Sequence, residues 1–350
     1  MLILPSEKYM KNSGFVRVLS AAAACSMLFS LTACNDKKVF DSTKVEKKVV
    51  MNVGELDVPL EIYRYVALNY KSSYEAGKTQ DIWLGDDGAA LLSEIKSAIS
   101  DTIVRMYATP AMCIEYGIGI DDTYITDSLD IKMDAIYEEF DNDYEAYVEE
   151  IKRYNMNDSV YRFLVREDLL ADELLYKMIE RGEIPTDTDQ LSEIIDSDDF
   201  IRVKQILVAS DNGKTHEENL RRAEELLEMA NSGDDFDTLV QNYGEDLFMF
   251  NNPDGYYFAR GCMHESFEDA AFELEVGEIS GIVETNAGYS IIKRYEKDQK
   301  YIDDNFEELC TSYIDGLYNM AVEKFAETLT AVPTEELDNY SIFTLPDIGE

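Results

Sequence analysis

The chain has 350 residues, of which 45% are hydrophobic, so it is long enough for two or three domains and too apolar for wholesale disorder. Its 72 Asp and Glu residues against 31 Lys and Arg residues give a formal net charge of −41. So acidic a surface repels phosphate groups, which argues against nucleic-acid binding and against electrostatic adhesion to anionic lipid.

The first 33 residues have the pattern of a signal peptide. Basic residues precede an apolar stretch over residues 18–33, which is shorter than the roughly 20 residues of a membrane-spanning helix. The stretch ends in Leu31-Thr32-Ala33-Cys34, which resembles the lipobox of bacterial lipoproteins. That resemblance implies cleavage after residue 33 and lipidation of Cys34, followed by a polar tether over residues 34–48. An ordinary secretory signal with an incidental cysteine is the alternative.

Residues 49–195 are predicted to form a helical domain. The apolar run Val49–Val53 indicates a short edge strand, and apolar residues recur at helical spacing after Pro59. The last helix begins after the capping side chain of Asn157 and ends before Gly182. The later helices are expected over Leu91–Tyr116, Ile125–Phe140, Tyr144–Tyr154 and Asp158–Arg181.

The pattern changes after the acidic linker Asp196–Asp199, and residues 196–298 are predicted to form a compact α+β unit of a normal domain size. Strands are indicated by alternating or apolar runs, and helices by amphipathic spacing. The expected strands are Phe200–Val208, 256–258, 281–284 and 289–295, and the expected helices are Glu217–Ser232, Phe236–Tyr243 and Ser266–Leu274.

Helical spacing resumes over Asp303–Leu329 and gives way to an apolar tail after Pro333. A helix of this length must bury its apolar stripe against a partner. We expect residues 299–350 to pack on the N-terminal helical domain, which makes the α+β unit an insertion. The stripe consists of Phe306, Leu309, Tyr313, Leu317 and Met320.

Neither a metal site nor a cofactor is expected from the distribution of Cys, His and acidic residues. Cys113, Cys262 and Cys310 lack CxxC spacing and are expected to be free, partly buried thiols. Asp141–Glu145 begins like a calcium-binding loop but lacks the required Gly, so we expect a solvated helix start there.

Several blocks of the central unit together resemble a parvulin domain, the PpiC-type rotamase. The blocks occur in family order across about 95 residues and are Val203–Val208, Arg260–Met263 with Phe267–Phe272, and Gly277–Ser280 followed by Val283–Thr285 and Gly288–Lys293. The flanking helices resemble those of SurA- and PrsA-type foldases more weakly, notably at Asp143–Tyr147 and Leu164–Leu175.

The resemblance implies an α+β fold in which a mainly α-helical N- and C-terminal chaperone region carries an inserted parvulin-like domain with a small antiparallel sheet. It implies a peptidyl-prolyl cis–trans isomerase domain within a lipid-anchored foldase on the extracytoplasmic face of a bacterial cell membrane. The partners would be unfolded secreted proteins and proline-containing peptides, and no nucleic acid is expected. A homodimer is possible.

Family positions also imply the site. Met263 and Phe267 would form an apolar cup for the proline ring, with Phe272 and His264 also facing substrate. Asp246 matches an acidic or thiol position and Thr285 a hydroxyl in a polar wall. The two histidines usual in parvulins are replaced by Gln205 and Ser290, and Gly255 stands at a commonly apolar position.

Because neither Gln nor Ser titrates near neutral pH as imidazole does, we expect isomerase activity to be weak or absent. A fully active isomerase and a non-catalytic holdase are alternatives within the same family. A solute-binding lipoprotein is the alternative from another class, but residues 60–182 show almost none of the strand–helix alternation that such proteins have.

Overall fold

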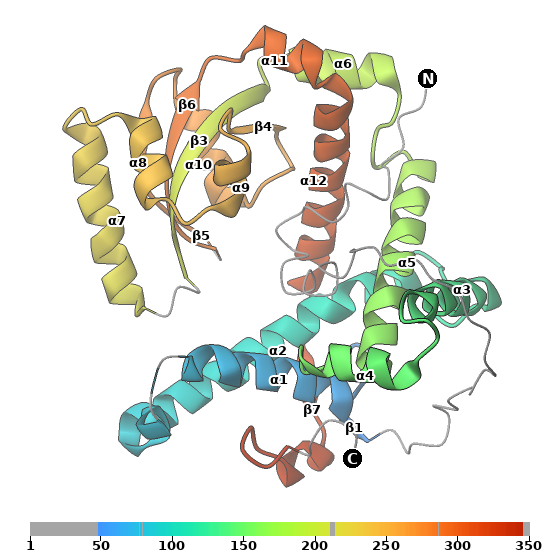
Figure 1. Cartoon of the computed structure of the whole chain (residues 1–350). Helices are drawn as coiled ribbons and strands as arrows, with labels where there is room; N and C mark the ends of the chain where they lie inside the picture. Colours follow the sequence, from blue (N-terminus) through green and yellow to red (C-terminus); the bar gives the residue numbers. More distant parts are fainter. Residues whose placement is uncertain (1–47, 77, 79, 211–213, 286, 346–350) are drawn as a thin grey trace. The chain divides into compact units, whose positions relative to one another are not determined.

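The computed structural model describes residues 48–345 except 77, 79, 211–213 and 286 (Figure 1). The predicted signal peptide, the lipidation site Cys34 and nearly all of the tether therefore lie outside the described residues. The described part of the chain divides into two compact units, treated separately below: residues 182–321 form the α+β unit, and residues 48–181 and 322–345 form the helical unit.

The helical unit consists of α-helices and a small antiparallel sheet in the order β2-β1-β7. The predicted helices are confirmed. The strand at Val49–Val53 is also present, but it lies in the centre of the sheet because Ala331–Pro333 from the C-terminal tail pairs with its free edge. Its elements are β1 (Val49–Val53), β2 (Leu56–Pro59), α1 (Leu60–Glu75), η5 (Gln80–Trp83), α2 (Gly85–Glu115), α3 (Thr123–Glu139), α4 (Tyr144–Lys152), α5 (Asp158–Glu180), β7 (Ala331–Pro333) and η6 (Glu335–Asn339).

Side-chain caps explain where two of these helices begin. Asn157 accepts a hydrogen bond from the Val160 amide at the start of α5, and Asp143 accepts from two amides at the start of α4. Each cap satisfies backbone donors that have no partner within the helix. The segment that begins like a calcium loop is thus a helix start.

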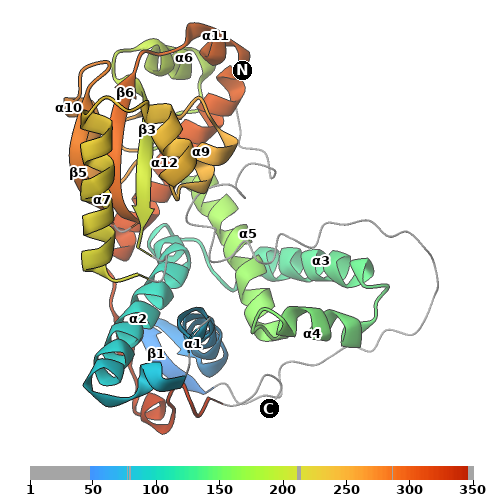
Figure 2. The same cartoon turned by 60° about the vertical axis from the view of Figure 1, so that its left-hand side comes forward.

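The α+β unit is built around a four-stranded antiparallel sheet in the order β4-β3-β6-β5 (Figures 1 and 2). All predicted strands and helices are present, and α6, α9 and the break before α12 are additional features. Its elements are α6 (Thr188–Asp196), β3 (Phe200–Ala209), α7 (His216–Asn231), α8 (Phe236–Tyr243), α9 (Leu247–Asn251), β4 (Tyr256–Ala259), α10 (Glu265–Glu273), β5 (Ile279–Thr285), β6 (Gly288–Tyr295), α11 (Gln299–Asp304) and α12 (Phe306–Ala326).

Strand alternation divides the core of this unit into two clusters, one on each face of the sheet. Ile206 and Val208 of β3 pack in the cluster formed with α7 and α8. Ile201 and Val203 pack in the opposite cluster, which contains Phe267 of α10. Because side chains two residues apart share a face of a strand, Gln205 and Leu207 lie on the same face as Val203.

The predicted packing of the C-terminal helix on the helical domain is wrong for most of α12. Tyr313 and Leu317 pack against the cluster around Phe267, within the α+β unit. The chain enters the helical unit only at Val322, and the tail residues Leu329 and Ile342 then pack in that unit's core as expected. An apolar stripe shows that a helix needs a partner but does not identify the partner.

None of the helices in the described part of the chain is long and apolar enough to span a bilayer.

Candidate functional site

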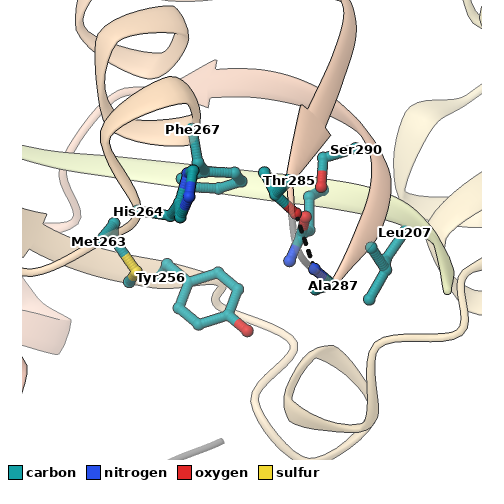
Figure 3. Close-up of a pocket in the computed structure, with 9 residues that line it drawn as sticks. Leu207, Tyr256, Met263, His264, Phe267, Thr285, Ala287 and Ser290 are labelled. Atoms are coloured by element: carbon teal, nitrogen blue, oxygen red, sulfur yellow. Dashed lines mark hydrogen bonds between the residues drawn. The ribbon is translucent and has the colours of Figure 1, made fainter. Parts of the chain in front are cut away.

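A pocket of about 130 Å³ opens on the sheet face that carries Gln205 and Leu207 (Figure 3). It lies among strand residues, the turn before α10 and the first turn of that helix. Figure 3 shows Met263, His264 and Phe267 on one side of the pocket and Thr285 and Ser290 on the other. The lining residues are Gln205, Leu207, Tyr256, Met263, His264, Phe267, Thr285, Ala287 and Ser290.

Strand register brings the polar residues together. Leu207 of β3 lies opposite Ser290 of β6, and Gln205 lies opposite Ile292, two residues further along. On the other side of β6, Ser290 lies opposite Val283 of β5, and Thr285 follows two residues later on the same face. The sheet thus presents the two residues at the usual histidine positions, together with the predicted hydroxyl, to one pocket.

The polar wall of the pocket contains two buried side chains and one hydroxyl that closes a turn. Gln205 is 8% exposed and Ser290 2% exposed, and both line the pocket. The Thr285 hydroxyl accepts a hydrogen bond from the Ala287 amide at 3.2 Å and donates to the Gly288 carbonyl at 3.4 Å, so it also closes the β5–β6 turn.

Asp246 lies behind the pocket and supports it. One carboxylate oxygen accepts hydrogen bonds from Gln205 Nε2 at 2.7 Å and from the Tyr256 hydroxyl at 2.8 Å. The other oxygen accepts from the Phe248 amide at 2.8 Å and caps α9. Because a carboxylate only accepts, this arrangement fixes the orientation of the Gln205 amide. Its Oε1 atom is buried and has no hydrogen-bond partner among the described residues.

The apolar lining of the pocket consists of Leu207, Tyr256, Met263 and Phe267, of which Leu207 lies beside Ser290. The Tyr256 ring stacks on Phe248 with centroids 4.3 Å apart and rings inclined by 11°. Tyr256 is thus held at its hydroxyl by Asp246 and on its ring face by Phe248, which gives this wall of the pocket a fixed position.

Phe272 does not line the pocket, so its predicted substrate-binding role is not supported by its position. Its ring packs edge-on against Phe258 and lies under the guanidinium of Arg260, in the core. The helix explains the difference: five residues at 3.6 residues per turn separate Phe267 and Phe272 by more than a third of a turn, so the two rings leave α10 in different directions.

His264 lines the pocket, and its Nδ1 lies 3.0 Å from the Ser266 hydroxyl. The other histidine, His216, lies at the start of α7 and interacts with the Tyr289 hydroxyl. No group of three or more His, Cys, Asp or Glu side chains in the described part of the chain is placed to hold a metal ion.

The sequence interpretation missed Leu207, Tyr256 and Ala287. Leu207 follows Gln205 by two residues, so strand periodicity alone places it on the same face. Tyr256 is explained by its neighbour Gly255, which has a φ of +94° and whose β-carbon, if present, would lie 2.4 Å from the Val203 carbonyl oxygen. No side chain fits at Gly255, and the ring of Tyr256 supplies the apolar surface instead.

The match to a family model agrees with this architecture. Residues 189–298 match the PPIC-type PPIASE domain, and this span contains all nine lining residues as well as Asp246. The sheet, the helices around it and the pocket therefore belong to a parvulin-type domain.

Longer similarities extend to foldases. The chain is 27% identical over 272 residues to the foldase protein PrsA of Caldanaerobacter subterraneus subsp. tengcongensis, covering 75% of this chain and 77% of that protein. It is 30% identical over 179 residues to PrsA of Geobacillus kaustophilus and 35% identical over 120 residues to PrsA of Bacillus subtilis, spanning 57% and 38% of those proteins. The predicted resemblance to a PrsA-type foldase with a parvulin domain is confirmed.

A solved structure of PrsA from Bacillus anthracis aligns over 68% of this chain and 96% of its own length, with 20% identity and a TM-score of 0.33.

Proposed function

We propose that this chain is a membrane-anchored, extracytoplasmic folding factor that binds unfolded secreted polypeptides, and that its parvulin domain holds proline residues but turns them over slowly. The helical unit would provide most of the client-binding surface. The proposal draws on the similarity to PrsA foldases for the general role and on the pocket for the fate of proline.

The proposal rests on the size of the pocket and on its combination of apolar and polar lining residues. At about 130 Å³ it is smaller than the roughly 300 Å³ or more of sites that enclose whole drug-sized ligands, so it suits a single ring. Met263 and Phe267 offer apolar contact on one side, while the strand residues Gln205 and Ser290 offer polar groups, with Leu207 beside Ser290. A proline ring is apolar and the peptide bond before it is polar, so this part of a peptide matches the apolar and polar parts of the pocket.

Prolyl isomerisation requires precise geometry rather than bond breaking. Rotation about the X–Pro bond crosses a barrier of roughly 18–20 kcal/mol and takes tens of seconds or more unaided. No covalent bond breaks, so a catalyst must favour the twisted amide over the planar one through groups already in place. An apolar cup that grips the ring and a polar wall beside the carbonyl meet this need.

The wall of this pocket is expected to be a weak catalyst. Gln205 is anchored to Asp246 through its amide nitrogen, and Ser290 has only a hydroxyl, so neither position supplies imidazole's two ring nitrogens, which exchange donor and acceptor roles, or its titration near neutral pH. Asp246 does not line the pocket, so we assign it to positioning Gln205 and Tyr256, while Thr285 shapes the β5–β6 turn beside the ligand.

A binding titration of the full chain with a proline-containing peptide tests the pocket. Met263→Ala should raise the dissociation constant several-fold because the cup loses its flexible apolar wall. Phe272→Leu is the matched control, since it changes an apolar residue of the same cluster outside the pocket and should leave the dissociation constant unchanged. Equal effects of the two variants, or no saturable binding by the wild type, would refute the assignment.

The anchoring part of the proposal is tested separately in cells. Cys34→Ala should release the protein from the membrane fraction or leave it unprocessed, because the thiolate is the nucleophile that accepts the lipid. Suppression of client aggregation should survive Met263→Ala, because the helical unit supplies that surface. Fully soluble wild-type protein with an unmodified Cys34 would contradict the anchor but not the pocket.

A further inference from the structure

We propose that α12 is the outer support of the proline pocket, and that Gly316 and Leu317 hold the turn over residues 260–264 in the position that places Met263 and His264 in the pocket wall. The inference rests on the proposed function of the pocket and adds a positioning role for a helix that follows the matched parvulin domain, which ends at residue 298.

The contact is unusually close for a helix against a turn. A β-carbon on Gly316 would lie 2.8 Å from Cβ and 3.1 Å from Sγ of Cys262, so only glycine allows this approach. One residue earlier, a β-carbon on Gly261 would lie 3.3 Å from a methyl carbon of Leu317. The Cys262 thiol also faces the Tyr313 carbonyl oxygen at 3.7 Å, so the turn approaches the helix at Tyr313, Gly316 and Leu317.

The same turn leads directly into the pocket. Met263 and His264 follow Cys262 and line the pocket, while Cys262 itself is buried in the cluster that contains Phe267. On the other side, the Gly261 amide donates to a Glu268 carboxylate oxygen at 2.6 Å, which ties the turn to α10. The turn is therefore held between α10 and α12, and a shift of Cys262 must move Met263.

Burial of the turn has a chemical signature. Burial raises the pKa of the Cys262 thiol to about 12, so at neutral pH the thiol stays protonated and unreactive while α12 is in place. Reaction of Cys262 with a thiol reagent therefore reports whether α12 is docked, without any ligand. Peptide mapping separates this label from that on Cys113 and Cys310.

Gly316→Ala in the full chain is the test. The alanine suits a helix better than glycine, so α12 itself should not weaken, but the added methyl group must push Cys262 away. We expect the dissociation constant for a proline-containing peptide to rise about five- to tenfold, the Met263 methyl resonance to shift and Cys262 to react faster with the thiol reagent, while the chain stays folded because the helix-favouring alanine offsets part of the strain. Ser312→Ala, an exposed position on the same helix, is the matched control and should change none of these.

A second variant checks the cause. Cys262→Gly removes the atoms closest to the added methyl group, so combining it with Gly316→Ala should restore much of the binding that the alanine alone loses. Unchanged affinity, methyl resonance and thiol protection in Gly316→Ala would overturn the role of α12. If the wild type binds no proline peptide, the proposed function fails instead, and the methyl resonance and Cys262 labelling still decide whether α12 positions the turn.

Discussion

Replacing Asp246 by Asn should destabilise the α+β unit because this carboxylate satisfies three donors at once. Its two oxygens accept from the side chains of Gln205 and Tyr256 and from the Phe248 amide, at 2.7–2.8 Å. An amide has only one oxygen, so its nitrogen must face either the Phe248 amide or the other two donors. At least one buried donor loses its partner, and the remaining hydrogen bonds lose their charged acceptor.

The magnitude follows from these contacts. A hydrogen bond to a charged group contributes about 1.5–3 kcal/mol, and relief of the buried charge offsets part of the loss. We expect Asp246→Asn to lower the free energy of unfolding of this unit by about 2–4 kcal/mol, and Tyr256→Phe, which removes one donor, by about 1 kcal/mol. The two losses should not add, because both variants disturb one network.

The chain offers a reporter for each unit. Its single Trp is Trp83 in the helical unit, so fluorescence follows that unit, while urea-dependent labelling of the buried Cys262 follows the α+β unit. Asp269→Asn is the control: this exposed acid pairs with Arg260 at 3.3 Å and should cost less than about 1 kcal/mol. A loss below about 1 kcal/mol for Asp246→Asn would refute the network as described.

Three further outcomes are expected. Gln205→His combined with Ser290→His should raise isomerase turnover at least about tenfold, because positioned acid–base groups contribute roughly two to four orders of magnitude; no rise in a protease-coupled assay would count against the pocket as a vestigial site. Gly255→Leu should lower the thermal midpoint of the α+β unit, since φ is +94° and the new side chain meets a backbone oxygen at 2.4 Å; a stable variant would contradict that geometry. Burial raises the pKa of Asp315 to about 6, so its carboxyl favours the folded state below about pH 4, and that contribution disappears as pH rises through 6. Asp315→Asn should therefore raise the free energy of unfolding by on the order of 2 kcal/mol at pH 7.5 and by little at pH 4. Equal effects at both pH values would contradict the burial of this carboxyl.

Much of the fold was accessible from the sequence because its elements are strongly periodic. The alternation in Phe200–Val208 predicted β3, and the amphipathic spacing after Asn157 predicted α5 with its cap. Partners of the elements were harder to predict. Val49–Val53 has the composition of an edge strand, and only the return of Ala331–Pro333 from the far end of the chain makes it central.

The site was predicted through family resemblance, and the differences between the predicted residues and the pocket lining have local causes. Phe272 has the residue type of a pocket wall, but the pitch of α10 turns it into the core. Tyr256 and Gly255 act as a pair, in which one position cannot hold a side chain and the next supplies the ring. Such an exchange depends on the distance to the Val203 carbonyl, which no sequence pattern encodes.

The direction of α12 shows the same limit. Tyr313 and Leu317 are apolar at helical spacing, and that spacing fits any complementary surface. The deciding residue is Gly316, which has a low helix propensity. Its presence in the helix is explained only by the close approach of Cys262.

Exchange NMR on a proline-containing peptide with the full chain tests at once whether the pocket binds proline and whether it catalyses isomerisation poorly. We predict that the Met263 methyl resonance shifts saturably with the proline peptide and not with its alanine counterpart, while the cis–trans exchange rate of the peptide stays close to its uncatalysed value. Exchange as fast as that given by a two-histidine parvulin measured alongside would contradict poor catalysis, and a Met263 resonance that does not respond to proline would contradict proline binding in the pocket.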